Sequence, residues 1–547
     1  MALLGKNKNL VESFALNLFL IASIVITPFY SFESINLPKF VVLIFFGCVA
    51  LIYISINFKI VLFRLPKISI LLLLGFIITY MVVFIASDTP WQQQLYGREN
   101  RRNGLLTHFS LILVFIIFHR LPYAKYLKKF VNRIVYAGLF VIIYALLQLL
   151  GVDPFKWDSV NLHFFSTLGN PNFLSAYIAA VTIPILSRIY SGFPPFKLYV
   201  RLVLVLMALL IVSFLIFRTF SYQGFISLFA SLSAFALIII YRNKKLKLFF
   251  ATFIFTSIFG LIAFAGTLNH GPLATILYKS SITSRGDFFR AAVNSGNSNF
   301  LTGTGFDSFG DYYLLYRDKI AGSRSSAEFT DSAHNYFLDL YATQGFFGIL
   351  FYLLLTLITL ISFFKIFKCA DSPSDGVVLF SIWIAIQFQS LVSPTNFLFL
   401  ILIFSISGLV IGSARDKEQS LKPITNGLSL TLGFLLCLVI SISAISRENQ
   451  ILVANQKGSP DKYISALEIF PKSTVGYSRA INLFAQAGFE TEALELSRKA
   501  LEFNRRTPAA HLVIFTSPFS SEEEKIIAYK ALLELDPMNP KIENLRP

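Results

Sequence analysis

Long apolar runs repeat along the first 445 residues and alternate with short polar segments. A helix needs about 20 apolar residues to cross about 30 Å of hydrocarbon, and these runs reach or approach that length. The pattern predicts about thirteen spans, at residues 11–30, 40–58, 68–86, 104–118, 134–150, 173–190, 199–217, 223–241, 248–267, 346–364, 377–393, 396–412 and 426–445. We therefore predict an all-α polytopic membrane protein with about 12 to 13 transmembrane helices.

The basic residues between the runs predict an orientation. With a cytoplasmic N-terminus, the inner segments carry 22 Lys and Arg residues and the short outer segments carry 6. Basic residues accumulate on the cytoplasmic side of membrane proteins. The sequence therefore predicts a multi-pass protein of the inner (cytoplasmic) membrane. Its long loop 268–345 and everything after residue 446 would lie on the periplasmic or extracellular side.

The last hundred residues change character. Residues 447–547 contain 13 basic and 13 acidic residues and repeat an Ala-Leu-Glu-apolar pattern at 466–469 and 500–503. A 34-residue period with helical spacing is typical of tetratricopeptide repeats, which stack helix pairs and bind peptides or proteins. We predict two domains: a transmembrane core over 1–446 and a tetratricopeptide-like tail over 447–547, which acts separately and contacts a protein partner or the acceptor.

The amino-acid composition limits the classes of binding partner. Hydrophobic residues make up 55% of the chain and charged residues 14%, well below the share of about 25% in soluble domains. The tail is neutral, so the net charge of +17 belongs to the membrane part. This distribution argues against nucleic-acid binding and indicates contact with membrane lipids.

Three arginines of one predicted outer segment, Arg98, Arg101 and Arg102, lie close together in the sequence. On a helical turn they would face one another at i, i+3 and i+4. Glu99 can neutralise only one of them, so we expect a phosphate or pyrophosphate, which suits the planar guanidinium, to neutralise the others. Interfacial anchoring to lipid headgroups is the alternative. Arg218, in another outer turn, either joins this anion site or anchors to headgroups.

The long outer loop contains the remaining candidates. Arg285 opens an amphipathic stretch that leads to a tight turn at Gly303-Thr304-Gly305. His334 follows Asp331 and Ser332, either of which can cap a helix, so we expect His334 in the first helical turn. The positive end of the helix dipole would keep its imidazole neutral and able to accept a proton. Gly345 and Gly348 would permit close helix approach where the chain re-enters the membrane.

Other chemistry is weakly indicated or absent from the sequence. Asp307 and Asp311 lie four residues apart and could hold a divalent ion, although a solvated loop face is the favoured interpretation. There is no phosphate-binding loop and no zinc-protease motif. We therefore predict neither a metal site nor a cofactor.

Several of these segments together resemble the bacterial O-antigen ligase and polymerase superfamily. His334-Asn335, nine residues and then Gly345-x-x-Gly348 are similar to its ligase signature, and Arg285 is similar to its donor-binding arginine. Segments 97–106 and 169–173 also resemble recurrent segments of that family. Many members have a Ser-Arg pair entering the eighth span, where this chain has Ser221-Tyr222-Gln223-Gly224 with Arg218 upstream.

This resemblance implies a GT-C-like membrane glycosyltransferase that is metal-independent and inverting. The donor would be a glycan on a polyprenyl (undecaprenyl) pyrophosphate, and the acceptor a glycan, lipid or protein hydroxyl. His334 would be the general base, and Arg285 with Arg98, Arg101, Arg102 and Arg218 would bind the pyrophosphate. Asn335, Gly345, Gly348, Gly303 and Gly305 would have structural roles.

These motifs do not separate an O-antigen ligase from a polysaccharide polymerase or a protein O-oligosaccharyltransferase. A transporter would place charged residues within its spans. A non-catalytic assembly scaffold would leave the outer arginines and His334 without a purpose. Both are less favoured interpretations of the sequence.

Overall fold

The computed structural model describes residues 10–30, 33–62, 65–157, 164–192, 197–278, 280–325, 328–368, 374–413 and 426–545. Throughout these ranges the regular structure is helical, and they contain no strand. The helices are α1 (Leu10–Ile24), α2 (Asn36–Ile56), α3 (Phe58–Val61), α4 (Lys67–Ala86), α5 (Trp91–Tyr96), α6 (Leu105–Arg120), α7 (Tyr123–Leu149), η1 (Ser166–Leu168), α8 (Pro171–Gly192), α9 (Leu198–Arg218), α10 (Tyr222–Arg242), α11 (Leu246–Thr267), α12 (Ala274–Leu277), α13 (Ser280–Ser298), α14 (Phe309–Tyr316), α15 (Lys319–Arg324), α16 (Tyr336–Lys368), α17 (Ser374–Ser390), α18 (Phe397–Gly412), α19 (Asn426–Lys457), α20 (Pro460–Leu467), α21 (Thr474–Gln486), α22 (Glu490–Phe503), α23 (Pro508–Thr516), α24 (Glu522–Leu535) and α25 (Pro540–Glu543).

The helices confirm the predicted all-α polytopic fold. Within the described ranges, nine helices are long and apolar enough to cross a membrane, namely α2, α4, α7, α8, α9, α10, α11, α16 and α19. The apolar helices α1, α6 and α18 are shorter. Each of the thirteen predicted runs overlaps one of these twelve helices or α17.

Two boundaries differ from the predicted ones. The first helix ends at Ile24 rather than at residue 30, because Pro28 follows and proline cannot continue a helix. At the other end of the core, α19 continues to Lys457, well past the predicted end of the span at residue 445. The helix therefore crosses the predicted domain boundary at residue 446 without a break.

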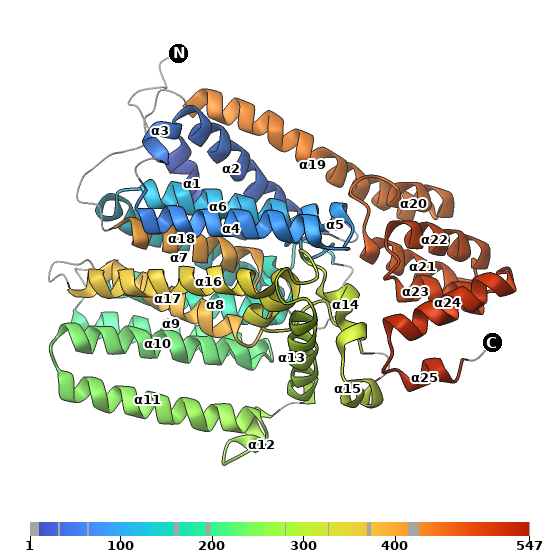
Figure 1. Ribbon diagram of the computed structural model, residues 1–547. Helices are drawn as coiled ribbons and strands as arrows, with labels where there is room; N and C mark the ends of the chain where they lie inside the picture. The colour runs from blue at the N-terminus through green and yellow to red at the C-terminus, as the bar shows by residue number, and fades with distance from the viewer. Residues whose placement is uncertain are drawn as a thin grey trace.

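The centre of the bundle is built on α6 and α18. All residues of α18 are buried, and Gly408 lies against the backbone of α6 at Phe115 and His119. A Cβ atom at Gly408 would overlap the Phe115 carbonyl, so glycine permits this close packing. In contrast, α11 lies at the edge of the bundle, and none of the residues in its apolar stretch is buried (Figure 1). An edge helix of this kind is suited to lipid contact.

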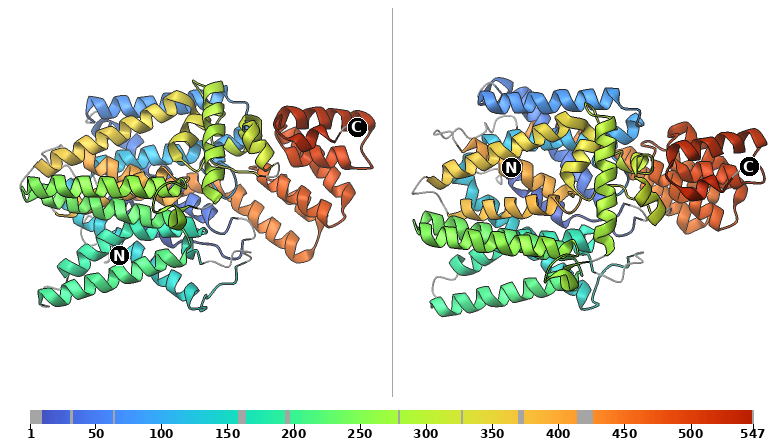
Figure 2. Two further views of the ribbon diagram at one scale, coloured as in Figure 1. Left: turned by 90° about the horizontal axis from the view of Figure 1, so that it is seen from below. Right: turned by 60° about the horizontal axis from the view of Figure 1, so that its bottom comes forward.

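One end of the bundle gathers the polar segments. Helix α13 runs crosswise to the spanning helices, and α14, α15 and the tail helices lie at that same end in all views (Figures 1 and 2). The sequence places these segments on one side of the membrane, and their shared end in the structure agrees with that prediction. The side itself, periplasmic or cytoplasmic, stays a prediction.

Cysteine labelling tests the orientation. In a cysteine-free background, an impermeant maleimide added outside should modify Ser323→Cys and Glu523→Cys and spare Lys245→Cys. All three positions are exposed, and Lys245 lies at the opposite end of the bundle, between α10 and α11 (Figure 1). Labelling of Lys245→Cys alone would show that the orientation is the opposite of the predicted one.

The tail is a row of antiparallel helices from α20 to α24. Its core contains Tyr477, Ala480 and Phe484 of α21, together with Ala493 and Ala500 of α22. These small and aromatic side chains are buried between neighbouring helices, as expected for stacked helical repeats. The assignment to the tetratricopeptide family stays a prediction.

Candidate functional site

The arginine segment after α5 is a compact turn whose guanidinium groups all have carboxylate partners. Arg98 Nη1 lies 2.6 Å from Asp311 Oδ1, and Arg102 forms an ion pair with Glu33. Both arginines are buried. The carboxylates that neutralise Arg98 and Arg102 come from distant parts of the chain, and Glu99 forms its ion pair with Arg447. These pairs neutralise Arg98 and Arg102 without a bound phosphate, so their phosphate-binding role stays a prediction.

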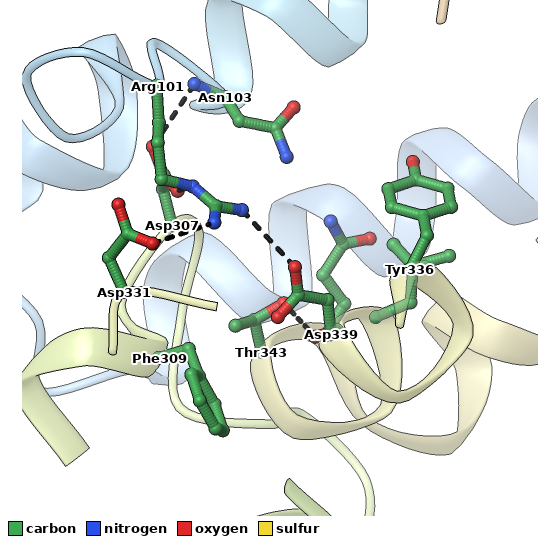
Figure 3. Close-up of a pocket in the computed structure, with 10 residues that line it drawn as sticks. Arg101, Asn103, Asp307, Phe309, Asp331, Tyr336, Asp339 and Thr343 are labelled. Atoms are coloured by element: carbon green, nitrogen blue, oxygen red, sulfur yellow. Dashed lines mark hydrogen bonds and ion pairs between the residues drawn. The ribbon is translucent and has the colours of Figure 1, made fainter. Parts of the chain in front are cut away.

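Arg101 lies in a small pocket and contacts three carboxylates (Figure 3). Its Nε lies 2.9 Å from Asp307, its Nη1 3.5 Å from Asp331 and its Nη2 3.2 Å from Asp339. We call this space the Arg101 pocket; its lining residues are Arg101, Asn103, Asp307, Phe309, Asp331, Tyr336, Asp339, Leu340, Thr343 and Gln344. The pocket combines one cationic side chain with three acidic ones.

Asp307 and Asp311 are buried rather than solvated, which corrects the favoured interpretation of the sequence. Asp307 accepts hydrogen bonds from the backbone N–H groups of Arg98 and Asn103 as well as from Arg101. Asp311 accepts from Arg98 and from Gln93. The two carboxylates organise the arginine turn. Among the described residues, no group of three or more His, Cys, Asp or Glu side chains is arranged to hold a metal ion.

His334 lies just before α16, not in its first turn as predicted. The helix begins at Tyr336, and Asn335 caps it by accepting from the N–H groups of Phe337 and Leu338. His334 has φ +52°, a left-handed conformation that is uncommon outside glycine. Asp339 stabilises this turn, since its carboxylate accepts from the N–H of Ala333 at 2.7 Å. Strained backbone of this kind concentrates at functional sites.

The surroundings of His334 keep its imidazole neutral. Burial, and then the positive charge of Arg285, lower the pKa of His334 from 6.5 to about 4, while Asp331 acts in the opposite direction. The imidazole ring stacks on Phe288 of α13, with ring centroids 5.4 Å apart. The prediction of a neutral imidazole therefore agrees with the structure, but the cause is burial beside a cation rather than a helix dipole.

Arg285 differs from the three arginines of the turn after α5. It precedes Phe288 by one helical turn of α13, and its charge acts on His334. Burial lowers the pKa of its guanidinium, and among the described residues it forms no ion pair or hydrogen bond. A half-buried cation without a carboxylate is costly unless an anion compensates it. Compared with Arg98, Arg101 and Arg102, Arg285 is thus the arginine most available to a ligand.

The predicted glycines lie where two segments of the backbone pack closely together. At Gly345 (φ +67°) α16 breaks, and the loop at Gly303 and Gly305 lies against this break. Thr304 N–H donates to the carbonyl of Ala342, and Gly305 N–H donates to Thr343. A Cβ atom at Gly345 or Gly303 would overlap the facing backbone. The predicted close approach is therefore made by a loop and a helix break, rather than by two helices.

The remaining predicted residues lie around this centre. Gly348 lies in α16 after the break. Asn335 also donates to the carbonyl of Leu391 at 3.0 Å, which ties the His334 turn to the α17–α18 connection. Arg218 lies at the end of α9 and is exposed. The structure shows no contact between Arg218 and the other site residues described here, so its role stays a prediction.

The tail packs tightly against the arginine turn and α14, which the sequence did not predict. Asn504 donates to Asp311, and Thr474 donates to Gln93, so four buried polar side chains form a closed ring across the interface. Arg447, in the last third of α19, forms a buried ion pair with Glu99. A tail acting separately from the core does not fit these contacts, and its removal would expose buried polar groups beside the site.

The ion pair between Arg317 and Asp536 permits a direct test of this interface. Arg317 is fully buried and donates to both carboxylate oxygens of Asp536, at 2.9 and 2.7 Å. Asp536→Ala should destabilise the protein by about 3 kcal/mol, because it removes the carboxylate that accepts two hydrogen bonds from the buried Arg317 guanidinium. Arg498→Ala, at an exposed pair in the same tail, should cost less than about 1 kcal/mol. Thermal unfolding in lipid nanodiscs would compare them, and equal effects would contradict a buried interface.

Two organising residues were missed in the sequence, namely Asp339 and Glu33. Asp339 joins Arg101 to the His334 turn, and Glu33 accepts from Arg102. Each carboxylate lies beside an apolar span, where ionisable residues are rare and usually functional or paired. That rarity was the available signal.

Part of the chain is similar to a known protein family. Residues 202–353 match the family described as O-antigen ligase. The matched region runs from α9 into α16 and contains Arg285, His334 and Gly345, whereas the arginine turn at 97–104 lies outside it. No curated protein matches the chain. The chain therefore combines many helices that are long and apolar enough to cross a membrane with a segment, residues 202–353, that is similar to the O-antigen ligase family.

Proposed function

We propose that this protein transfers a glycan from a polyprenyl-pyrophosphate donor to an acceptor hydroxyl at the outer face of the cytoplasmic membrane. The match to the O-antigen ligase family supports glycan transfer of the ligase or polymerase type. The observation that carries the proposal is a neutral His334 beside Arg285, a cation without a carboxylate partner among the described residues. Together they offer a base and an anion-binding group.

The chemistry follows from these two side chains. His334 accepts the proton of the acceptor hydroxyl while its oxygen bonds to the anomeric carbon of the donor sugar. The bond from that carbon to the pyrophosphate oxygen breaks, and the pyrophosphate leaves with the electron pair. Arg285 stabilises the negative charge that develops on this leaving group. Attack opposite the leaving group inverts the anomeric carbon, and no metal takes part in any step.

Arg285 is the primary pyrophosphate ligand in this proposal. Arg98 and Arg102 are buried in ion pairs, so binding phosphate would require them to exchange carboxylates. They instead hold the turn that carries Arg101. The tail, on the outer face, stabilises that turn and contributes a surface for the acceptor or a protein partner.

Reconstituted transfer tests the function. The full chain in lipid nanodiscs receives a synthetic polyprenyl-pyrophosphate glycan and, in separate reactions, a lipid A–core acceptor, a polysaccharide acceptor or an acceptor protein. We expect product with at least one acceptor, an inverted linkage by NMR and undiminished activity in EDTA. Absence of product with all three acceptors, or loss of activity in EDTA, would contradict the proposal.

A further inference from the structure

We infer that the Arg101 pocket is a carbohydrate subsite that binds hydroxyl groups of the acceptor glycan, separate from the pyrophosphate position at Arg285. This inference rests on the proposed function. It assigns the two substrates to opposite sides of His334. The pocket and Arg285 differ in charge and in the hydrogen-bonding groups that they leave free.

The charge of the pocket is unsuited to phosphate. Its lining contains three carboxylates and one guanidinium. All three guanidinium nitrogens of Arg101 already contact a carboxylate. Nη2 contacts Asp339, Nη1 contacts Asp331, and Nε contacts Asp307. An entering phosphate would meet excess negative charge and no unused guanidinium nitrogen.

Buried acceptor atoms remain available in the pocket. Asn103 Oδ1 and Gln344 Oε1 are buried and have no hydrogen-bond partner within the described part of the chain. Gln344 as a whole is 3% exposed. The side chain of Asp331 is 47% exposed, so its carboxylate is accessible from outside. Buried oxygens without donors are costly, and hydroxyl groups are the donors that would satisfy them.

The position of the pocket fits an acceptor. Asp331 and Tyr336 flank His334 in the sequence and line the pocket, while Arg285 approaches His334 from α13. A sugar with one hydroxyl edge in the pocket would place a neighbouring hydroxyl near the imidazole. The pocket is small, so it admits hydroxyl groups at the edge of a sugar ring rather than a whole oligosaccharide (Figure 3).

Saturation-transfer NMR on the full chain in nanodiscs tests the subsite without requiring turnover. The probes are methyl hexopyranosides, a methyl 2-amino-2-deoxyhexoside and inorganic pyrophosphate. We expect the neutral hexosides to bind, and Asn103→Leu and Asp331→Asn each to weaken that binding about fivefold, the effect of one hydrogen bond. Arg285→Ala should leave hexoside binding unchanged but abolish pyrophosphate binding. Asn243→Leu is the matched control, because Asn243 follows the last residue of α10, far in the bundle from the Arg101 pocket.

Each outcome has one meaning for the subsite. Hexoside binding that is absent, or that is equal in wild type and Asn103→Leu, overturns the inference. So does displacement of the hexosides by pyrophosphate, or binding of the amino sugar alone. None of these results decides whether the protein transfers glycans, because the reconstituted reaction and its dependence on His334 are measured separately.

Discussion

Replacing His334 with alanine should reduce the rate of glycan transfer by about 10²- to 10⁴-fold, the usual contribution of a general base. The alanine variant should still insert and bind donor, because the imidazole contributes one stacking contact with Phe288 and the structure shows no hydrogen bond to it among the described residues. Initial rates with saturating donor and acceptor measure the effect. Activity above about a tenth of wild type would exclude His334 as the base.

The pH dependence distinguishes a base from a residue that only supports the fold. Because the pKa of His334 is lowered to about 4, its imidazole is neutral throughout the range above that value. The transfer rate should therefore stay level from pH 8 to about pH 5 and fall near pH 4, rather than near the ordinary histidine pKa of about 6.5. An acid limb near pH 6.5 would contradict the environment described for His334.

Arg285 should shift this profile in a defined direction. Its positive charge lowers the pKa of His334, so removing it should raise that pKa. The residual activity of Arg285→Ala should then begin to fall at a higher pH than that of wild type. A purely structural role for Arg285 would reduce activity without moving the acid limb.

Replacing Arg285 with lysine should be nearly as harmful as replacing it with alanine, and we expect both to reduce the transfer rate about a hundredfold. Loss of one preorganised donor to a developing anion commonly costs 10²- to 10³-fold. Lysine retains the charge but loses the planar pair of donors that binds phosphate oxygens. Rates at saturating donor, together with donor affinity, separate the loss of binding from the loss of turnover.

Arg290 supplies the matched control for Arg285. It lies on the same helix, is partly exposed and has carboxylate partners in Asp287 and Asp318. Arg290→Lys should change the rate by less than about threefold, because lysine can keep the ion pairs with Asp287 and Asp318. If Arg285→Lys behaved like Arg290→Lys, pyrophosphate recognition by the Arg285 guanidinium would be refuted.

The sequence predicted the spanning helices well because each one is a local apolar pattern. The end of α1 was misplaced because the apolar run continues past Pro28, where helical backbone stops. His334 was placed inside a helix for a similar reason, since Asp331 and Ser332 are good capping residues but Asn335 makes the cap. Local propensity does not show which of several competing caps the tertiary structure will use.

The ion pairs of the site could not be predicted from local sequence patterns. Arg102 and Glu33 are 69 residues apart, and Arg101 and Asp307 are 206 residues apart. Neither periodicity nor spacing links such residues. The hydrogen bond between Asn504 of the tail and Asp311 of α14 joins positions 193 residues apart. For this reason the tail was predicted to be separate from the core, although its fold as a row of helices followed from its repeat.

A structure with a non-transferable phosphonate analogue of the donor would test the central claim most directly. We expect the phosphonate oxygens within hydrogen-bond distance of Arg285, about 2.7–3.2 Å, and the anomeric carbon facing His334. Arg98 and Arg102 should keep their carboxylate partners Asp311 and Glu33. A phosphonate bound among Arg98, Arg101 and Arg102, with those carboxylates displaced and Arg285 distant, would contradict the proposed site.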